Sequence, residues 1–246
     1  MRKLWNSGVG LFVLIIALAL AACGGAAPQP LILGGPAWRS GEISRYQVTD
    51  RTGQRAGTAT VNITASGAGN ATGWTLRREI NAGQVEVAAV TMVGQSYRPA
   101  RSFLTRTDSA GTQTVEATIE RAQVDIILTD RQGAVTYQRV NVPSDIRDER
   151  TLLTLARTLP LAGRYATRIN SFLPIVGLVE RVTVSVRRRE RVTVPAGEYD
   201  TWLIELRTPD RTTQAWIGVD APHPVVKFID ARSKGLFELT KFEAGG

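Results

Sequence analysis

Hydrophobic and polar residues alternate with a period of two over much of the chain after residue 40. The clearest stretch is 57–65, where Ala59, Val61 and Ile63 are separated by threonine and asparagine. This period places one set of side chains on each face of a β-strand. We therefore predict strands that bury one face and expose the other.

Turn-forming sequences interrupt the alternation about every ten residues, as in Asp50-Arg51-Thr52-Gly53 and Asn81-Ala82-Gly83. This spacing is typical of antiparallel all-β folds. The predicted strands are 43–48, 57–65, 74–80, 85–93, 97–105, 112–119, 124–128, 134–142, 163–169, 179–187, 190–194, 199–207, 212–219, 224–229 and 234–242.

One segment has helical spacing instead, with Leu152, Leu155 and Leu159 on one face. We predict a helix over 148–158 that Ser144 or Asp148 caps and Pro160 ends. The predicted fold is mainly β: an antiparallel curved sheet or incomplete β-barrel with this helix covering its open side. The sequence leaves open whether the barrel closes.

The first 22 residues have the order of a secretory signal peptide. Arg2 and Lys3 precede an apolar run from Leu11 to Ala22, which is shorter than the roughly 20 residues that a membrane span needs. Leu20-Ala21-Ala22-Cys23 resembles the bacterial lipobox. That resemblance implies cleavage before Cys23 and attachment of lipid, with acyl chains such as palmitate.

Cys23 is the only cysteine, and its place favours a lipoprotein over an ordinary cleaved signal or an uncleaved anchor. Two or three acyl chains hold a protein firmly on a bilayer. We predict an exported protein, lipid-anchored to the extracytoplasmic face of a bacterial membrane. Residues 23–40 are predicted to be a lipidated flexible tether, in which Leu31-Ile32-Leu33 docks on the domain or enters the membrane interface. Residues 41–246 are predicted to form a single β-rich domain.

The C-terminal third carries a specific pattern: Val194-Pro195-Ala196-Gly197-Glu198-Tyr199, then Trp216-Ile217, then Pro224-Val225-Val226. It resembles a family of exported bacterial proteins of unknown function, the TapB-like or DUF3108-like proteins. The opening Tyr46-x-Val-x-Asp50-x-x-Gly53 is similar to the first hairpin of that family. The resemblance implies a mostly antiparallel β fold in the bacterial envelope and implies no reaction.

The formal charge of +8 falls to +6 when Arg2 and Lys3 are lost with the signal, and nearly all of the positive charge is arginine. A basic surface is attracted to anionic lipid headgroups, and we expect no nucleic-acid partner for an exported chain. The run Arg187-Arg188-Arg189-Glu190-Arg191 is interpreted as a solvated hairpin end with one internal ion pair. The alternative is a site for lipid phosphates or acidic glycans.

The residues offer little for catalysis. His223 is the only histidine, and no His/Cys metal cluster is possible. No cofactor motif is present. Glu198, Asp200 and Glu205 are candidate carboxylates for a hydrolase, but nothing separates them from surface acids. We expect no enzyme, no cofactor, no metal site and no catalytic residues.

The preferred hypothesis is an envelope lipoprotein of uncharacterised role whose β domain binds an apolar or amphipathic ligand, such as a lipid, in a concavity. The residues expected to line the concavity are Trp202, Trp216, Phe228, Leu152 and Leu155. The alternatives are a protein-interaction or scaffold module, which binds an envelope protein through an edge strand or the arginine-rich segment, and a carboxylate-based hydrolase.

Overall fold

A computed structural model describes residues 27–67 and 73–246, and in these ranges 15 strands form one sheet. The first eight strands are β1 (Glu42–Thr49), β2 (Arg55–Ser66), β3 (Gly73–Asn81), β4 (Val85–Val93), β5 (Arg98–Asp108), β6 (Gly111–Glu120), β7 (Gln123–Thr129) and β8 (Val135–Asn141). The others are β9 (Arg147–Asp148), β10 (Ala166–Leu173), β11 (Leu178–Val194), β12 (Gly197–Arg207), β13 (Thr212–Gly218), β14 (Val225–Ile229) and β15 (Leu236–Glu243).

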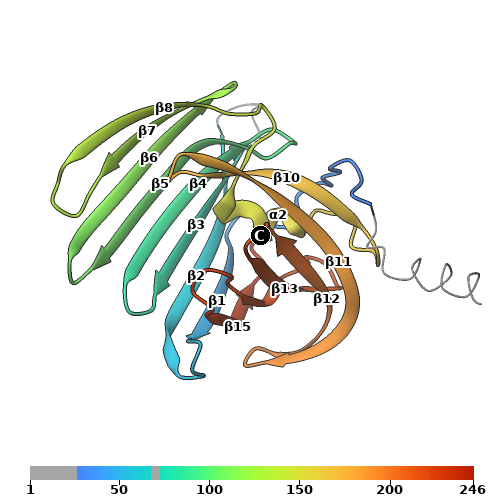
Figure 1. Ribbon diagram of the computed structural model, residues 1–246. Helices are drawn as coiled ribbons and strands as arrows, with labels where there is room; N and C mark the ends of the chain where they lie inside the picture. The colour runs from blue at the N-terminus through green and yellow to red at the C-terminus, as the bar shows by residue number, and fades with distance from the viewer. Residues whose placement is uncertain (1–26, 68–72) are drawn as a thin grey trace, which may run out of the picture.

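The sheet is an open, curved antiparallel sheet. Strands β1 to β8 follow one another as a meander on one side, β15 to β9 continue on the other, and β1 pairs with β15 where the two halves join. Among the 15 strands of the described residues, only β9 and β10 form a parallel pair. Strands β8 and β9 are the two edges, so the barrel is incomplete. In Figure 1 the first half spreads as a broad fan, and in the second half the long β11–β12 hairpin curls round below β13 and β15.

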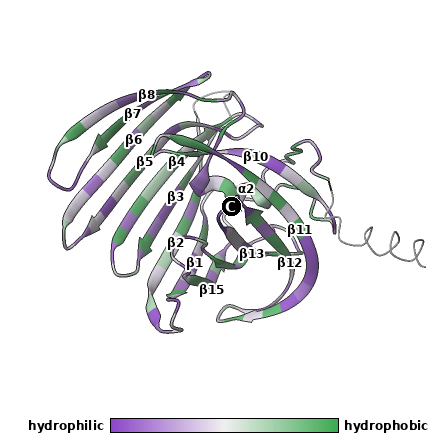
Figure 2. Ribbon diagram, in the orientation of Figure 1, coloured by the Kyte–Doolittle hydropathy of each residue, from purple (hydrophilic) through white to green (hydrophobic). Residues whose placement is uncertain are grey.

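The mainly β prediction is confirmed, and the first eight predicted strands match β1 to β8 closely. The burial pattern of β1 illustrates the alternation that predicts these strands, since every second residue is buried. Figure 2 shows hydrophobic and hydrophilic positions following one another along these strands. The inner face of the first half supplies most of its buried apolar side chains.

Strand β11 corrects the prediction of two separate strands, 179–187 and 190–194. It is continuous from Leu178 to Val194, and its register with β12 shifts between Val186 and Arg188. This β-bulge places one extra residue in the strand and lets it bend without ending. The short β9 strand is absent from the sequence prediction.

The predicted helix over 148–158 is shorter in the structure. A 3₁₀ turn, η2 (Glu149–Thr151), leads into α2 (Leu152–Ala156). The side chain of Asp148 accepts a hydrogen bond from the N–H of Arg150, so Asp148 is the cap. Figure 1 shows α2 between the two halves of the sheet, where Leu152 and Ala156 pack against the inner face of β10 to β13.

The structure corrects the predicted flexible tether over residues 29–40, the segment before β1. Leu31 and Leu33 pack on the buried core of the second half, and Trp38 is 3% exposed. Ile32 points outward and is 53% exposed. Leu31, Leu33 and Trp38 therefore dock on the domain, whereas Ile32 does not. Among the described residues, no helix has the length and apolar character required to cross a bilayer.

A charged and apolar cleft between the halves of the sheet

A cleft of about 700 Å³ lies between the two halves of the sheet, beside η2 and α2. Its apolar lining comes from both halves and from the helix, and includes Leu104, Leu152, Val182, Leu206, Phe228 and Phe237. Five arginines and five acidic residues line the same space. The arginines are Arg78, Arg106, Arg150, Arg211 and Arg232, and the acids are Asp50, Glu86, Glu149, Glu180 and Asp230.

Glu86 on β4 lies between two arginines of the neighbouring strands. Arg78 donates to Glu86 Oε1 at 2.5 Å, and Arg106 donates to Oε2 at 2.8 Å. Burial alone raises the pKa of the Glu86 carboxyl, but the charges and hydrogen bonds of Arg78 and Arg106 outweigh it, so that the pKa lies below its ordinary value. Glu86 therefore stays ionised, and the group of three carries one net positive charge.

These two arginines keep unused donors. The Nε atoms of Arg78 and Arg106 are buried and have no hydrogen-bond partner among the described residues. A buried donor without a partner is destabilising.

The beginning of the helical segment adds a second charged group. Arg150 donates to both carboxylate oxygens of the fully buried Asp148, at 2.9 and 2.8 Å, and Ser102 donates to Asp148 at 2.6 Å. Glu149 turns the other way and accepts from Arg232 at 2.9 Å. Burial raises the pKa of Glu149, and Arg232 only partly offsets this effect.

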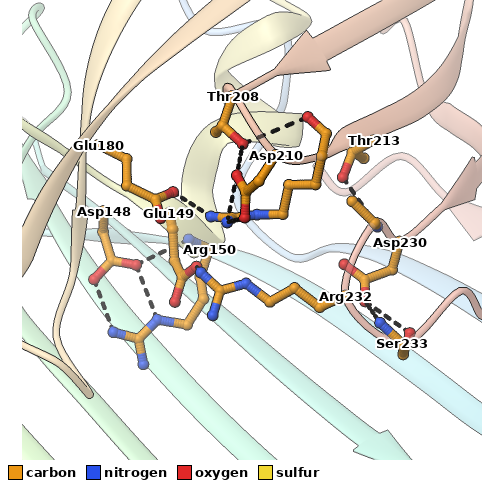
Figure 3. Close-up of polar contacts among 12 residues, drawn as sticks. Asp148, Glu149, Arg150, Glu180, Thr208, Asp210, Thr213, Asp230, Arg232 and Ser233 are labelled. Carbon is orange, nitrogen blue, oxygen red and sulfur yellow. Dashed lines mark hydrogen bonds and ion pairs between the residues drawn. The ribbon is translucent and has the colours of Figure 1, made fainter.

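A third charged group lies on the side of the cleft that the second half of the sheet forms. There Arg211 bonds Glu180 and donates to Asp210 at 3.0 Å. Thr208 donates to Asp210 at 2.6 Å. Figure 3 shows these side chains meeting from the η2 segment, from β11 and from the β12–β13 and β14–β15 turns. Segments that are far apart in the sequence thus supply the paired charges of the cleft.

The structure brings two of the five predicted lining residues into the cleft, Leu152 and Phe228. Leu155 does not line it and instead packs, 1% exposed, under Trp38 and β3–β4. The position of Leu155 is corrected because α2 lies between the two halves of the sheet: Leu152 packs against the second half, whereas Leu155 packs against the first.

Trp202 and Trp216 also lie outside the cleft lining. Trp202 packs on the core beside α2 and under the guanidinium of Arg189, whose Cζ is 4.7 Å from the ring centroid. Trp216 projects from the other face of the sheet, since its neighbour Ile217 is in the core. There its Nε1 donates to Glu190, and Lys227 lies 5.5 Å from the ring centroid.

The other sequence candidates are scattered. Asp200 pairs with Arg191 at 3.0 Å and Glu205 with Arg187 at 3.4 Å, both outside the cleft lining. Glu198 is exposed on β12. His223 Nδ1 lies 3.0 Å from the carbonyl oxygen of Gly218 in the β13–β14 turn. No group of three metal-ligating side chains occurs in residues 27–67 and 73–246.

The run from Arg187 to Arg191 lies within β11 and not at the hairpin end, which corrects the predicted position. The turn follows at Pro195 and Ala196. The expected internal ion pair is present, with 2.7 Å between Arg188 and Glu190. In Figure 2 this stretch is the hydrophilic outer curve of β11. Cys23 lies outside the described residues.

The charged group of Arg78, Glu86 and Arg106 is the feature that the sequence prediction missed, although the alternation of buried positions indicates it. Leu76 is buried on β3, so Arg78 two residues later is on the same inner face. Glu86 follows the same rule with Ala88 on β4, and Arg106 with Leu104 on β5. Charges in register with buried positions therefore mark the inner face of these three strands.

Comparison with known proteins agrees with this architecture. The family model described as "Protein of unknown function (DUF3108)" matches residues 45–235. A β-barrel-like protein of the domain of unknown function DUF1849 from Brucella abortus superposes with a TM-score of 0.51 at 10% identity, covering 84% of this chain and 98% of that one. At this identity the likeness concerns the fold alone.

Two other solved structures match with lower scores. A candidate lipoprotein from Parabacteroides distasonis has a TM-score of 0.33 at 10% identity, covering 85% of this chain and 99% of that one. An exported-protein candidate with a YmcC-like fold from Bacteroides fragilis has a TM-score of 0.27 at 9% identity, covering 87% and 100%. Such scores carry no argument. No functionally curated protein matches the chain in sequence.

Proposed function

The chain belongs to the DUF3108 family of proteins of unknown function, and we propose that it is an exported, lipid-anchored bacterial envelope protein whose cleft binds an amphipathic molecule. The observation that carries the proposal is that the lining of the cleft is both apolar and charged. Apolar side chains such as Leu206 and Phe228 line the same space as paired arginines and acids. Known ligand sites combine an apolar lining with a few placed polar groups.

In this proposal the apolar part of the ligand lies along Leu152, Val182 and Leu206, and its polar group meets the wall formed by Arg78, Glu86 and Arg106. The volume of about 700 Å³ is within the range of small-molecule sites. The net positive charge of the group formed by Arg78, Glu86 and Arg106 favours a ligand with oxygen acceptors.

The anchor rests on the N-terminal sequence alone, with a signal-like segment that ends at Leu20-Ala21-Ala22-Cys23. The protein is proposed to be non-catalytic. Glu86, Glu149 and Glu180 each bond an arginine, and in this role they fix the arginine side chains and take no part in proton transfer.

A second candidate function is binding of an envelope protein through the sheet edge. Strand β8 is an unpaired edge on which Tyr137 is 75% and Val135 50% exposed. An exposed edge strand is a template for pairing with another chain.

Native mass spectrometry of the chain from residue 24 onward, purified without detergent, tests ligand binding. The described fold lies within this part of the chain. We expect extra mass that disappears on solvent extraction, with an amphiphile recovered in the extract. A mass equal to that of the protein alone after incubation with membrane extract contradicts the proposal. The β8 edge is then the candidate binding site.

A filled cleft provides the matched variant. Ala82 lines the cleft in the β3–β4 turn, so Ala82→Trp should remove the extra mass because the indole takes the space of the ligand. Ala110→Trp places the same side chain in the exposed β5–β6 turn, away from the cleft lining, and should retain it. Equal retention by both variants would place the ligand elsewhere.

A further inference from the structure

The segment before β1 fixes where the chain leaves the domain on its N-terminal side. The N–H of Gln29 donates to the carbonyl oxygen of Ala166 at 2.7 Å, and Thr167 Oγ1 donates to the carbonyl oxygen of Gln29 at 2.9 Å. Gln29 thereby pairs, in parallel, with the start of β10. Leu31 and Leu33 hold the following residues on the core.

Five residues lie between Cys23 and Gln29, so the chain takes six residue steps from one to the other. Fully extended, they reach about 20 Å at most. If Cys23 carries lipid, as in the proposed function, the start of β10 lies within about this distance of the bilayer surface. A link of this length would keep the β10 side of the domain near the membrane.

The outer face of β10 to β12 presents arginines at this place. Arg168 on β10 and Arg207 on β12 are both paired with Thr183 of β11, which lies between them. Arg181 projects from the same face of β11, and Arg164 lies just before β10. We call Arg164, Arg168, Arg181 and Arg207 the arginine face.

All four arginines of this face are exposed, and none of them forms an ion pair within residues 27–67 and 73–246. The neighbouring Glu205 pairs with Arg187 instead. The residues between the arginines, Thr183 and Asn170, are polar, and Asn170 donates to the one acid at the edge of this group, Asp145, at 2.8 Å. The arginine face is thus positive and contains no apolar centre, whereas the core of a protein–protein interface is apolar.

We propose that the arginine face rests on the anionic headgroups of the membrane that holds the lipid anchor. Arginine pairs well with phosphate oxygens because its planar donors match them, and the attraction acts within about a Debye length of the surface. The inference rests on lipidation of Cys23 in the proposed function and is independent of a ligand in the cleft. It orients the domain, with β10 to β12 toward the bilayer.

Fluorescence quenching on the lipidated full chain tests this orientation. With Cys23 lipidated, Thr183→Cys introduces the only free thiol, and a fluorophore there reports contact with headgroup spin-labelled lipid. The control is Thr118→Cys, which is exposed on the outer face of β6 in the other half of the sheet. Vesicles contain phosphatidylethanolamine with either phosphatidylglycerol or phosphatidylcholine.

We expect strong quenching at residue 183 in the vesicles with phosphatidylglycerol and little at residue 118. Each arginine changes the ratio of docked to undocked domain about fivefold, so replacing Arg168, Arg181 and Arg207 together by glutamine should lower it on the order of 100-fold. Quenching at residue 183 should then fall to the level of the control.

Mass spectrometry of the same samples separates the two levels of failure. A chain without lipid on Cys23 overturns both the anchor and the orientation. Lipid on Cys23 together with equal quenching at residues 183 and 118, or with quenching that the glutamine variant retains, overturns the orientation alone.

Discussion

The ion pair between Glu42 and Arg157 joins parts of the chain that are 115 residues apart. Arg157 donates to both carboxylate oxygens, at 2.6 and 2.8 Å, and also to the carbonyl oxygens of Ala37 and Pro222. Its side chain is 3% exposed and that of Glu42 is 2% exposed. One guanidinium thus connects the segment before β1, the first strand, the helix end and the β13–β14 turn.

Replacing Arg157 by methionine should lower the free energy of unfolding by about 3–5 kcal/mol, because Glu42 is left buried without a counter-charge. Urea unfolding measures this change. The double variant Glu42→Gln with Arg157→Met should recover part of the loss. Arg139→Ala removes an exposed pair with Asp125 and should have a much smaller effect; a comparable effect would contradict the argument.

Glu86 gives stability that depends on pH. Its pKa in the folded protein is lowered from the ordinary 4.5, so its ionised form favours folding above the unfolded pKa, and this contribution is lost as the pH falls through the folded value. Glu86→Gln should therefore destabilise the protein by about 1–3 kcal/mol near neutral pH.

The difference between the wild type and Glu86→Gln should shrink as the pH falls below 4.5, because Glu86 is then protonated in the unfolded wild type and progressively in the folded one. Urea midpoints measured for both proteins across this range report it. A difference that is independent of pH would show that the carboxylate charge is not what Glu86 contributes.

At the scale of elements, the segment before β1 behaves as a part of the domain. Trp38 packs edge-on against Trp74, with ring centroids 5.9 Å apart, and against Tyr97 at 5.2 Å. Tyr97 also donates to the carbonyl oxygen of Gly34 at 3.0 Å. The glycines and prolines of this segment interrupt any strand or helix pattern in the sequence, although Trp38 belongs to the core and Leu33 packs against it.

Trp38→Ala should lower the free energy of unfolding by about 3–5 kcal/mol, since it empties a buried aromatic site. Ile32→Ala, in the same segment but exposed, should change it by no more than about 0.5 kcal/mol. Thermal unfolding of both variants compares the two. Equal stability would mean that residues 27–40 contribute nothing to the fold and act as a tether.

The curvature of the second half comes from β11 and β12. The bulge near Arg187 bends the hairpin, and the N–H of Ala196 at its end donates to the carbonyl oxygen of Leu239 on β15 at 2.9 Å. The hairpin thereby passes the shorter β13 and β14 and contacts the strand at the centre of the sheet. Neither the bulge nor this contact follows from local alternation, because both depend on strands distant in sequence.

At the scale of the whole molecule, the sheet stays open and its two halves face each other across α2 and the β10–β11 hairpin. Phe172 and Ile175 of this hairpin pack on the inner face of the first half, and Leu152 packs on the second. The helix and hairpin fill much of the concavity. The remaining space is the cleft, and its charged residues lie where turns of the second half approach strands of the first.

The sequence by itself determined the strands, the turns between them and the mainly β class, because a period of two and turn-forming residues are local properties. Its C-terminal motif indicated the family for the same reason. It also supplied Cys23 and the signal-like segment on which the proposed anchor depends. Sequence alternation marked Phe228 and Trp216 as strand residues but did not decide which face bounds a cavity.

Only the tertiary structure decided that the barrel stays open, that Trp38 and Leu33 belong to the core, and that charges from distant strands and turns meet in one cleft. These features depend on pairs such as Glu42 with Arg157 and Glu149 with Arg232, which are far apart in sequence. Which residues pair depends on how the curved sheet folds back over the helix. No pattern within one strand contains that information.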